Sequence, residues 1–326
     1  MSRPAVDLQA GRDYPRDWNQ FSDWFADEDR CLVYLEGLRW PDGFICPRCG
    51  ERQQPNRLSR GRLMCPACRH QSTVTSGTVF DKTRTPLRTW LAAAWYITSQ
   101  KYGVSALGMQ RVLGLGSYQT AWTMLHRLRR AMVRSGREAL SGEVEVDESY
   151  VAIVDPDKLG KGVKNRSNTT KTLIAIAVEL IKPKGFGRIR LRRIANGSEQ
   201  YLLPFVRETV APGARIHTDG SPAYRSLSAF GFKHRKIVHL GAKDAAHVTM
   251  PAVHRVASLV QRWLLGTHQG AVQASQLDYY LDEFTFRFNR RTSRSRGLLF
   301  YRLLEQAVAA NPVTYRNIAV RGQKPQ

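Results

Sequence analysis

The chain has 326 residues and a mass of 37.0 kDa, enough for one to three domains with a sizeable core. Hydrophobic residues make up 42% of it, which excludes a wholly disordered protein. Lysine and arginine number 50 against 27 acidic residues, so the net charge is +23 and predicts a polyanionic partner, with nucleic acid the first candidate. The longest apolar run, Leu173–Val178, is far shorter than the roughly 20 residues of a membrane helix. Residues 1–19 lack a signal-peptide pattern, and we expect a soluble cytoplasmic protein without disulfides.

Four of the five cysteines form two CxxC pairs, Cys46 with Cys49 and Cys65 with Cys68, separated by fifteen residues. Each pair places two thiols on one side of a tight turn, and two such turns can close a tetrahedron of sulfur around Zn²⁺. Four thiolates leave no open coordination position, so the predicted zinc is structural. The alternative is redox-active or buried free cysteine. The fifth cysteine, Cys31, lies in a helical pattern and is interpreted as a packing residue.

Helical patterns follow the cysteine pairs. Helices are predicted over 86–101 and 118–134, with a shorter one capped by Ser105. A glycine-containing turn separates the last two, which is the outline of a helix-turn-helix. The last helix carries several basic side chains, and Arg127 and Arg130 are candidates for DNA contact. The alternative is a helical linker with a solvated basic face.

From residue 143 the hydrophobic period changes to that of strands. Strands are predicted over 143–151, 171–181, 187–194, 215–219 and 236–240, and helices over 198–210 and 222–230 and from 252. This order is that of an RNase H-like mixed sheet with flanking helices. The predicted fold class is therefore α/β, preceded by an N-terminal zinc ribbon and a helix-turn-helix-like region.

Two aspartates stand out in this order. Asp147 lies in the first strand and Asp219 at the end of the fourth, and these strands are neighbours in an RNase H-like sheet. Both carboxylates can then face one point and hold a pair of divalent ions about 4 Å apart, Mg²⁺ or Mn²⁺. Such a pair activates a water or a 3′-hydroxyl for attack on a phosphodiester. Alternatively, an acidic residue that ends a strand serves only to form a turn.

A third ligand is expected on the helix that follows. Val253 and Val256 belong to its apolar stripe, and His254 and Gln261 lie on a polar stripe beside it. Residues 248–277 contain no acidic residue, so His254 is the best candidate, with a structural histidine as the alternative. Imidazole is tolerated better by Mn²⁺ than by Mg²⁺.

The string 276–291 has apolar side chains at helical spacing and is predicted to pack on the sheet. Asp282 and Glu283 are then exposed or paired with arginines rather than catalytic, and Glu283 is the reserve metal ligand. A basic cluster that can follow a DNA backbone comes next, with a solvated turn as the alternative. It contains Arg290, Arg291 and Arg294.

Several strings carry a family resemblance. Among them are Arg39–Gly50, Val146–Tyr150, His217–Gly220, Pro251–Val256 and Tyr280–Arg291. With them, nearly the whole chain resembles the zinc-ribbon group of bacterial insertion-sequence transposases of the DDE class. The resemblance implies that Asp147 and Asp219 are the first two members of the catalytic triad and that His254 is the third, at a position that varies in the group. The family tends to carry lysine at position 261, where this chain has Gln261.

We therefore predict N-terminal helices and a zinc ribbon over 1–80, a helix-turn-helix-like DNA-binding region over 81–140, the catalytic domain over 141–310 and a C-terminal tail over 311–326. The predicted reaction is metal-dependent cleavage and strand transfer of double-stranded DNA at terminal inverted repeats. A homodimer or larger assembly at the nucleoid is expected, because two ends must be cut together. Two alternatives remain: a DNA-binding regulator with a degenerate RNase H-like domain, and a purely hydrolytic nuclease.

Overall fold

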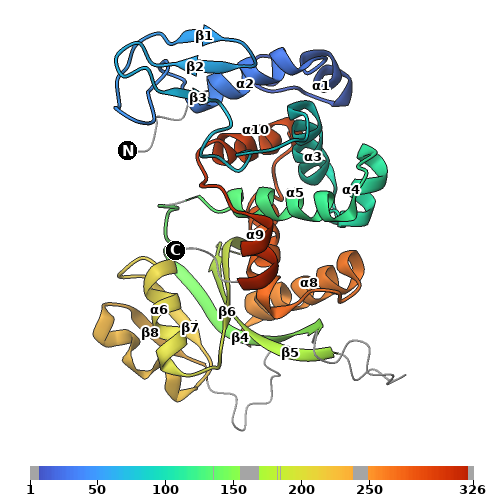
Figure 1. The fold of residues 1–326 in the computed structure, drawn as a ribbon. Coiled ribbons are helices and arrows are strands. Elements are labelled where there is room, and N and C mark those ends of the chain that lie inside the picture. The colour runs from blue at the N-terminus through green and yellow to red at the C-terminus, as the bar shows by residue number, and fades with distance from the viewer. Residues whose placement is uncertain are drawn as a thin grey trace. The chain divides into compact units, whose positions relative to one another are not determined.

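A computed structural model describes residues 7–134, 136–154, 169–181, 183, 185–237 and 249–321 (Figure 1). The chain divides into two compact units, Met1–Arg134 with Thr292–Tyr315 and Ser135–Arg291 with Arg316–Gln326. The sequence pattern assigns residues up to 310 to the catalytic domain. Residues 292–315 instead belong to the first unit, because helix α10 (Arg296–Ala307) packs against α3 (Leu87–Ser99).

The first unit combines helices with a small sheet. Besides α3 and α10, its helices are α1 (Trp18–Trp24), α2 (Glu28–Arg39), α4 (Ala106–Leu113) and α5 (Tyr118–Ala131). The strands β1 (Asn56–Leu58), β2 (Arg62–Met64) and β3 (Gln71–Thr73) form an antiparallel sheet. Phe300 of α10 packs its ring against Phe21 of α1 and Trp95 of α3, at centroid distances of 5.6 and 5.4 Å. Cys31 is fully buried, which confirms its packing role.

Helices α4 and α5 follow the predicted helix-turn-helix pattern. The side chain of Ser105 accepts a hydrogen bond from the amide of Gly108 at 3.0 Å, so it caps α4 as expected. Gly114 ends α4 in the left-handed region, with φ of 62°, where glycine avoids the steric cost of a Cβ. Ser117 then caps α5. These caps define the turn between the two helices.

The second unit contains a five-stranded sheet in the order β6-β5-β4-β7-β8. The strands are β4 (Glu143–Val154), β5 (Thr169–Leu180), β6 (Phe186–Ile194), β7 (Arg215–Thr218) and β8 (Lys233–Lys236). Neighbours β4, β5 and β6 pair antiparallel, whereas β4 with β7 and β7 with β8 pair parallel. The predicted RNase H-like mixed sheet is confirmed. The last strand begins earlier than predicted, and residues 238–240 lie outside the described residues.

Helices cover both faces of this sheet. They include α6 (Glu199–Thr209), α8 (Pro251–His268), α9 (Leu277–Asn289) and the 3₁₀ helix η3 (Pro222–Phe230). The unit also contains the 3₁₀ helix η4 (Ala274–Gln276) and the π-helix η5 (Asn317–Arg321). The segment 222–230 is thus a 3₁₀ helix rather than an α-helix. None of the helices in the described ranges combines the length and the apolar composition of a membrane span.

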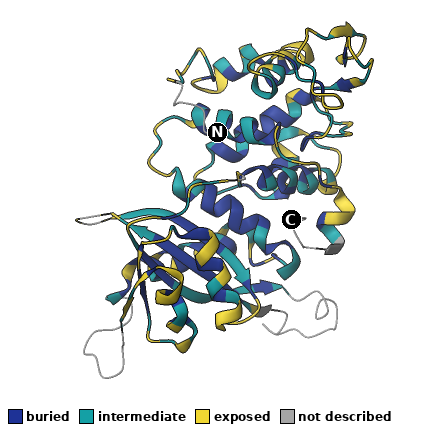
Figure 2. Ribbon diagram, turned by 90° about the vertical axis from the view of Figure 1, so that its left-hand side faces the viewer, coloured by how far each residue is buried: buried dark blue, intermediate teal, exposed yellow. Residues whose placement is uncertain are grey.

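Side chains of β4 alternate between the two helical layers. Val151 and Ile153 pack with α8 and α9, whereas Val144 and Val146 pack with α6 and η3. Figure 2 shows buried residues along the central strands and on the helices that pack against them. Because alternate residues of a strand share a face, Asp147 lies on the face covered by α8.

Candidate metal centres and DNA-binding residues

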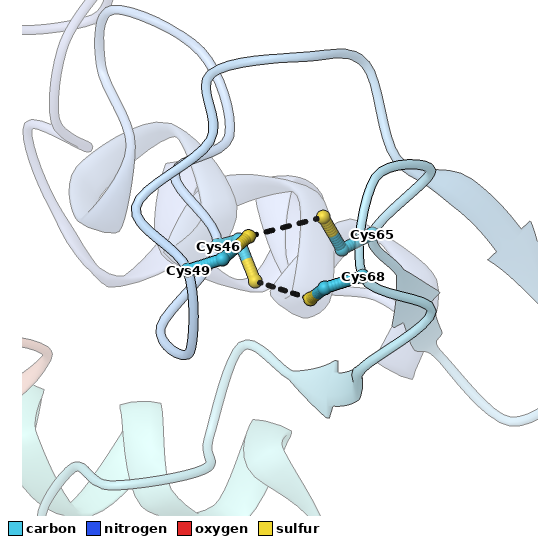
Figure 3. Close-up of side chains that lie close together, drawn as sticks. All are labelled: Cys46, Cys49, Cys65 and Cys68. Atoms are coloured by element: carbon cyan, nitrogen blue, oxygen red, sulfur yellow. Dashed lines mark hydrogen bonds between the residues drawn. The ribbon is translucent and has the colours of Figure 1, made fainter.

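The four cysteines of the CxxC pairs lie together in the first unit (Figure 3). Their Sγ atoms are all within 4.8 Å of one another, with Cys46 3.6 Å from Cys68 and Cys49 3.7 Å from Cys65. A tetrahedron of sulfurs at the usual zinc–sulfur distance of about 2.3 Å has edges of about 3.8 Å. The cluster therefore has the donor atoms and the spacing to hold a zinc ion.

The two cysteine turns have the same backbone. In each, the amide of the first cysteine donates to a carbonyl five residues later, and the residue four positions on donates back to that cysteine. The position after the second cysteine is left-handed in both turns, with φ of 75° at Gly50 and 58° at Arg69. A side chain in that region costs energy, so the second turn carries a strain that the first avoids.

The parallel pairing of β4 and β7 brings the two predicted catalytic aspartates together. Glu145 pairs with His217, so the same register places Asp147 opposite Asp219, one step beyond the end of β7. Both aspartates are half-buried. Together with burial, their two negative charges raise the pKa of Glu148. The two carboxylates, which are far apart in the sequence, therefore lie close to a common neighbour.

Two further residues belong to this neighbourhood and were missed by the sequence analysis. The hydroxyl of Tyr224 donates to Oε2 of Glu148 at 2.7 Å, and Tyr224 is 1% exposed. Burial and the nearby carboxylates raise the pKa of Tyr224. The sequence feature that could have drawn attention to this neighbourhood is Glu148, a second acidic residue directly after Asp147. Local amides also hold the aspartates, because Oδ1 of Asp147 accepts from Glu148 and Oδ1 of Asp219 accepts from Ser221.

His254 lies in the first turn of α8 and is half-buried. Immediately before it, the amides of Ala252 and Val253 donate to one carboxylate oxygen, Oε2 of Glu145, at 2.8 and 3.0 Å. Burial raises the pKa of Glu145 against the effect of these bonds. These two hydrogen bonds attach the N-terminus of α8 to β4, the strand that carries Asp147.

Asp147, Asp219 and His254, together called the acidic site, form a less compact group than the cysteine cluster. Among the described residues, the four cysteines are the group of three or more ligands whose donor atoms all lie within 4.8 Å. Asp147, Asp219 and His254 do not form so compact a set. Two carboxylates and an imidazole suit Mg²⁺ or Mn²⁺ in donor chemistry, and a pair of ions about 4 Å apart needs a wider donor set than one ion. The donor atoms of these three residues thus suit divalent cations.

Glu283, the reserve ligand, has a different environment. Its side chain is fully buried, and Nε of Arg287 donates to Oε1 at 2.9 Å. The expected pairing of Glu283 with an arginine is confirmed. Asp282 is also buried, at 6% exposure, so the alternative expectation of an exposed carboxylate is wrong for both residues. Both lie on α9, whose side chains are largely buried.

Helix α5 is less open than its sequence indicates. His126 and Arg129 are buried, at 0% and 1% exposure, so the expected exposed basic face is wrong at these positions. Arg127 donates to the carbonyls of Val79 and Asp81 at 3.2 and 3.1 Å, and Nε of Arg130 donates to a carbonyl at 3.2 Å. Their role in DNA binding stays a prediction.

The arginines after α9 show a similar pattern. Arg290 lies over the ring of Phe286 at 4.0 Å, and Arg291 lies over Phe288 at 4.1 Å. Arg291 also donates to the carbonyls of Phe186 and Gly187, and burial lowers its pKa. Arg294 is exposed and has open access to solvent. DNA binding by these three arginines also stays a prediction.

Gln261 lies two turns beyond His254 on α8. Its amide nitrogen donates to the carbonyl oxygen of Tyr150 at 2.8 Å, so the helix is also joined to the far part of β4. A cavity of about 380 Å³ opens here, and its lining includes Tyr150, Lys171 and Gln261. Gln261, which stands where the resembling family tends to carry lysine, therefore lies at an exposed surface beside β4, the strand that carries Asp147.

Comparisons with known proteins give two family matches and one curated relative. Residues 139–289 match the family model of the ISXO2-like transposase domain, and residues 26–71 match that of the transposase zinc-ribbon domain. A curated relative from Halobacterium salinarum is described as an uncharacterized protein in transposable element ISH50. It is 26% identical over 277 residues, which cover 81% of this chain and 91% of the relative. The first match contains Asp147, Asp219 and His254, and the second contains the four clustered cysteines.

Proposed function

We propose that this chain, which belongs to the zinc-ribbon group of insertion-sequence transposases, cuts the DNA ends of its element and joins them to a target. The observation that supports the proposal is the parallel β4–β7 register, which brings Asp147 level with Asp219 when it is continued two residues beyond the Glu145–His217 pair. A basic chain with a net charge of +23 suits a DNA substrate.

In this proposal Asp147, Asp219 and His254 hold two divalent cations, Mg²⁺ or Mn²⁺. When bound, such ions activate water or a 3′-hydroxyl and neutralise charge on the leaving oxygen. The chain's own contribution is to position these groups. The amides of Glu148 and Ser221 each donate to one oxygen of an aspartate and so help to orient the two carboxylates. The hydrogen bond from Tyr224 keeps the Glu148 side chain away from this role.

The cysteine cluster is proposed to hold one structural zinc ion. The sulfur distances of 3.6 and 3.7 Å and the paired turns support this assignment. Zinc would stabilise the ribbon sheet, whose core cluster of Phe44, Cys46, Leu63 and Cys65 is small. We propose that the ribbon and the α4–α5 pair bind the terminal repeats, and that two or more copies act together at the nucleoid.

The decisive experiment incubates purified protein with labelled terminal-repeat DNA and Mg²⁺ or Mn²⁺. Loss of a group that only orients a metal ligand commonly lowers metal affinity or activity about 10–100-fold. Loss of a ligand itself should cost more, so Asp147→Asn and Asp219→Asn should each reduce the cleavage rate by more than about 100-fold. DNA affinity should be retained, as measured by gel shift. Cleavage that survives either substitution contradicts the assigned site.

Two other functions are distinguished by the same assay. The exposed Gln261, at a position where the family tends to carry lysine, motivates a DNA-binding regulator without catalytic activity. Binding of the repeats without cleavage would support the regulator. Cleavage without a joined product would support a hydrolytic nuclease. A joined product, sequenced across the junction, is the result expected of a transposase.

A further inference from the structure

We propose that Glu145 is a positioning residue that fixes the start of α8, and with it His254, beside Asp147. The inference rests on the proposed function, in which His254 is a cation ligand. Glu145 lies two residues before Asp147 in β4, so the two side chains lie on the same face of the sheet. It would act through His254 and not by binding the substrate.

The first observation is the pair of hydrogen bonds that Glu145 accepts. The first amides of an α-helix have no partner within the helix and carry partial positive charge. Here the amides of Ala252 and Val253 meet a carboxylate that is 4% exposed. A carboxylate is costly to bury unless such donors compensate it. Among the described residues, the only β4 side chains that belong to the apolar cluster on this face are Val151 and Ile153, so the burial of Glu145 is explained by its hydrogen bonds to α8 and not by apolar packing.

The second observation is that α8 is attached to β4 at two levels. One attachment is Glu145 to the first turn, and the other is the bond from Gln261 to the carbonyl of Tyr150 at 2.8 Å. The helix therefore runs in the same direction as the strand. Asp147 lies between the two attached strand positions, and His254 lies between the two attached helix positions. Both attachments limit sliding of His254 past Asp147.

The hydrogen-bond geometry allows the role of the Glu145 acceptor oxygen to be tested separately from the role of its negative charge. Both amides donate to the same oxygen, Oε2, so a single acceptor oxygen suffices to hold the helix. Glutamine offers one carbonyl oxygen at nearly the same place, whereas alanine offers none. A positioning role therefore predicts that Glu145→Gln retains most function and that Glu145→Ala does not. Removal of an orienting partner of a metal ligand commonly costs 10–100-fold in affinity.

The test measures Mn²⁺ binding to the full-length, zinc-loaded protein by calorimetry without DNA. Glu145→Ala should weaken Mn²⁺ binding about 10–100-fold, and Glu145→Gln should stay within about 5-fold of the parent. Hydrogen exchange should rise over residues 250–256 in the alanine variant. Glu143→Ala is the matched control, because Glu143 lies on the same face of β4 and its carboxylate contacts Arg215 and His217 of β7. Its Mn²⁺ affinity should change less than about 2-fold.

A double-mutant cycle tests whether Glu145 acts through His254. In a His254→Ala background, Glu145→Ala should weaken Mn²⁺ binding no further. The proposal would be overturned if the two substitutions lowered Mn²⁺ affinity additively. It would also be overturned if Glu145→Ala kept the Mn²⁺ affinity and the hydrogen exchange of the parent protein. Should the alanine variant fail to fold, Glu145→Asp replaces it in the cycle, because a side chain one methylene shorter moves the acceptor away from the amides. It should then bind Mn²⁺ more weakly than Glu145→Gln, and the opposite order would overturn the proposal.

Failure of the proposed function gives a different result. If Asp147→Ala and Asp219→Ala bind Mn²⁺ as tightly as the parent, the aspartates are not the cation site and the proposed function fails. If these two variants lose Mn²⁺ while Glu145→Ala keeps it, the cation site stands and only the positioning role of Glu145 is wrong.

Discussion

The cysteine cluster and the proposed acidic site of Asp147, Asp219 and His254 are built in opposite ways. The cysteines come from two short turns with the same backbone hydrogen bonds, and their sulfurs all lie within 4.8 Å. The acidic site draws Asp147, Asp219 and His254 from two strands and a helix, and its geometry depends on strand register and helix attachment. A local centre depends on its own loops, whereas a distributed centre depends on the whole unit around it.

The largest expected effect is loss of the cysteine cluster. Cys46→Ser should remove zinc and unfold the ribbon, because structural zinc contributes about 10–16 kcal/mol of apparent binding energy in small zinc domains. Zinc content by atomic absorption and protease resistance of residues 40–75 measure the result. Cys31→Ala is the control, since Cys31 is buried away from the cluster, and it should keep its zinc. Unchanged zinc in Cys46→Ser would exclude the assignment.

The next effect separates the two candidates for the third acidic-site ligand. Glu283→Ala leaves the partly buried Arg287 without its carboxylate and should destabilise the second unit by about 3–5 kcal/mol, measured by urea unfolding. Folded protein should bind Mn²⁺ normally. His254→Ala should do the reverse, with little change in stability and weak Mn²⁺ binding. The opposite pattern would make Glu283 the ligand.

A smaller effect tests how strongly an ion pair supports the edge of the sheet. Burial alone would raise the pKa of Glu179, but bonds from Arg188 and Ser141 lower it from 4.5 to about 2. A lowered folded-state pKa stabilises the protein above pH 4.5, and this contribution is lost as the pH falls from 4.5 towards about 2. Glu179→Gln should cost about 1–2 kcal/mol at pH 7 and almost nothing near pH 2, measured by urea unfolding. An equal cost at both values would contradict the ion-pair account.

The strain in the second cysteine turn gives a still smaller effect. Arg69 has φ of 58° at the position where the first turn has Gly50. Arg69→Gly should therefore stabilise the zinc-loaded ribbon by about 0.5–1 kcal/mol, measured by thermal unfolding. Arg69→Ala, which removes the charge and keeps the strain, is the control. A similar gain in both variants would assign the effect to charge.

The smallest effect concerns Gln261. Gln261→Lys adds a positive charge at the exposed surface beside β4 and should raise DNA affinity a few-fold, with the salt dependence steeper by about one charge. Gln261→Met removes the hydrogen bond to Tyr150 without a charge and serves as the control. An identical salt dependence in Gln261→Lys and the parent would show that DNA does not reach this surface.

The sequence predicted the local centre more fully than the distributed one. The CxxC spacing alone predicts almost the whole cysteine cluster, and strand periodicity with the order of elements predicted the mixed sheet. The shared role of Asp147 and Asp219 stays a prediction. Glu145 and Tyr224 were missed, because the partner of each lies on an element distant in sequence. The burial of Arg129 was missed because charge predicts exposure until tertiary packing is known. The position of α10 was missed for the same reason, since its partner α3 precedes it by two hundred residues.

The return of the chain to its first unit has a consequence for synthesis. The larger part of the second unit, Ser135–Arg291, is inserted within the first, and Phe300 completes the aromatic core around Phe21 and Trp95. A ribosome that has released the first 134 residues has therefore made a body with an open apolar core. A stop codon in the inserted part would yield a fragment that lacks α10 and exposes this core, and exposed apolar surface of this kind favours aggregation.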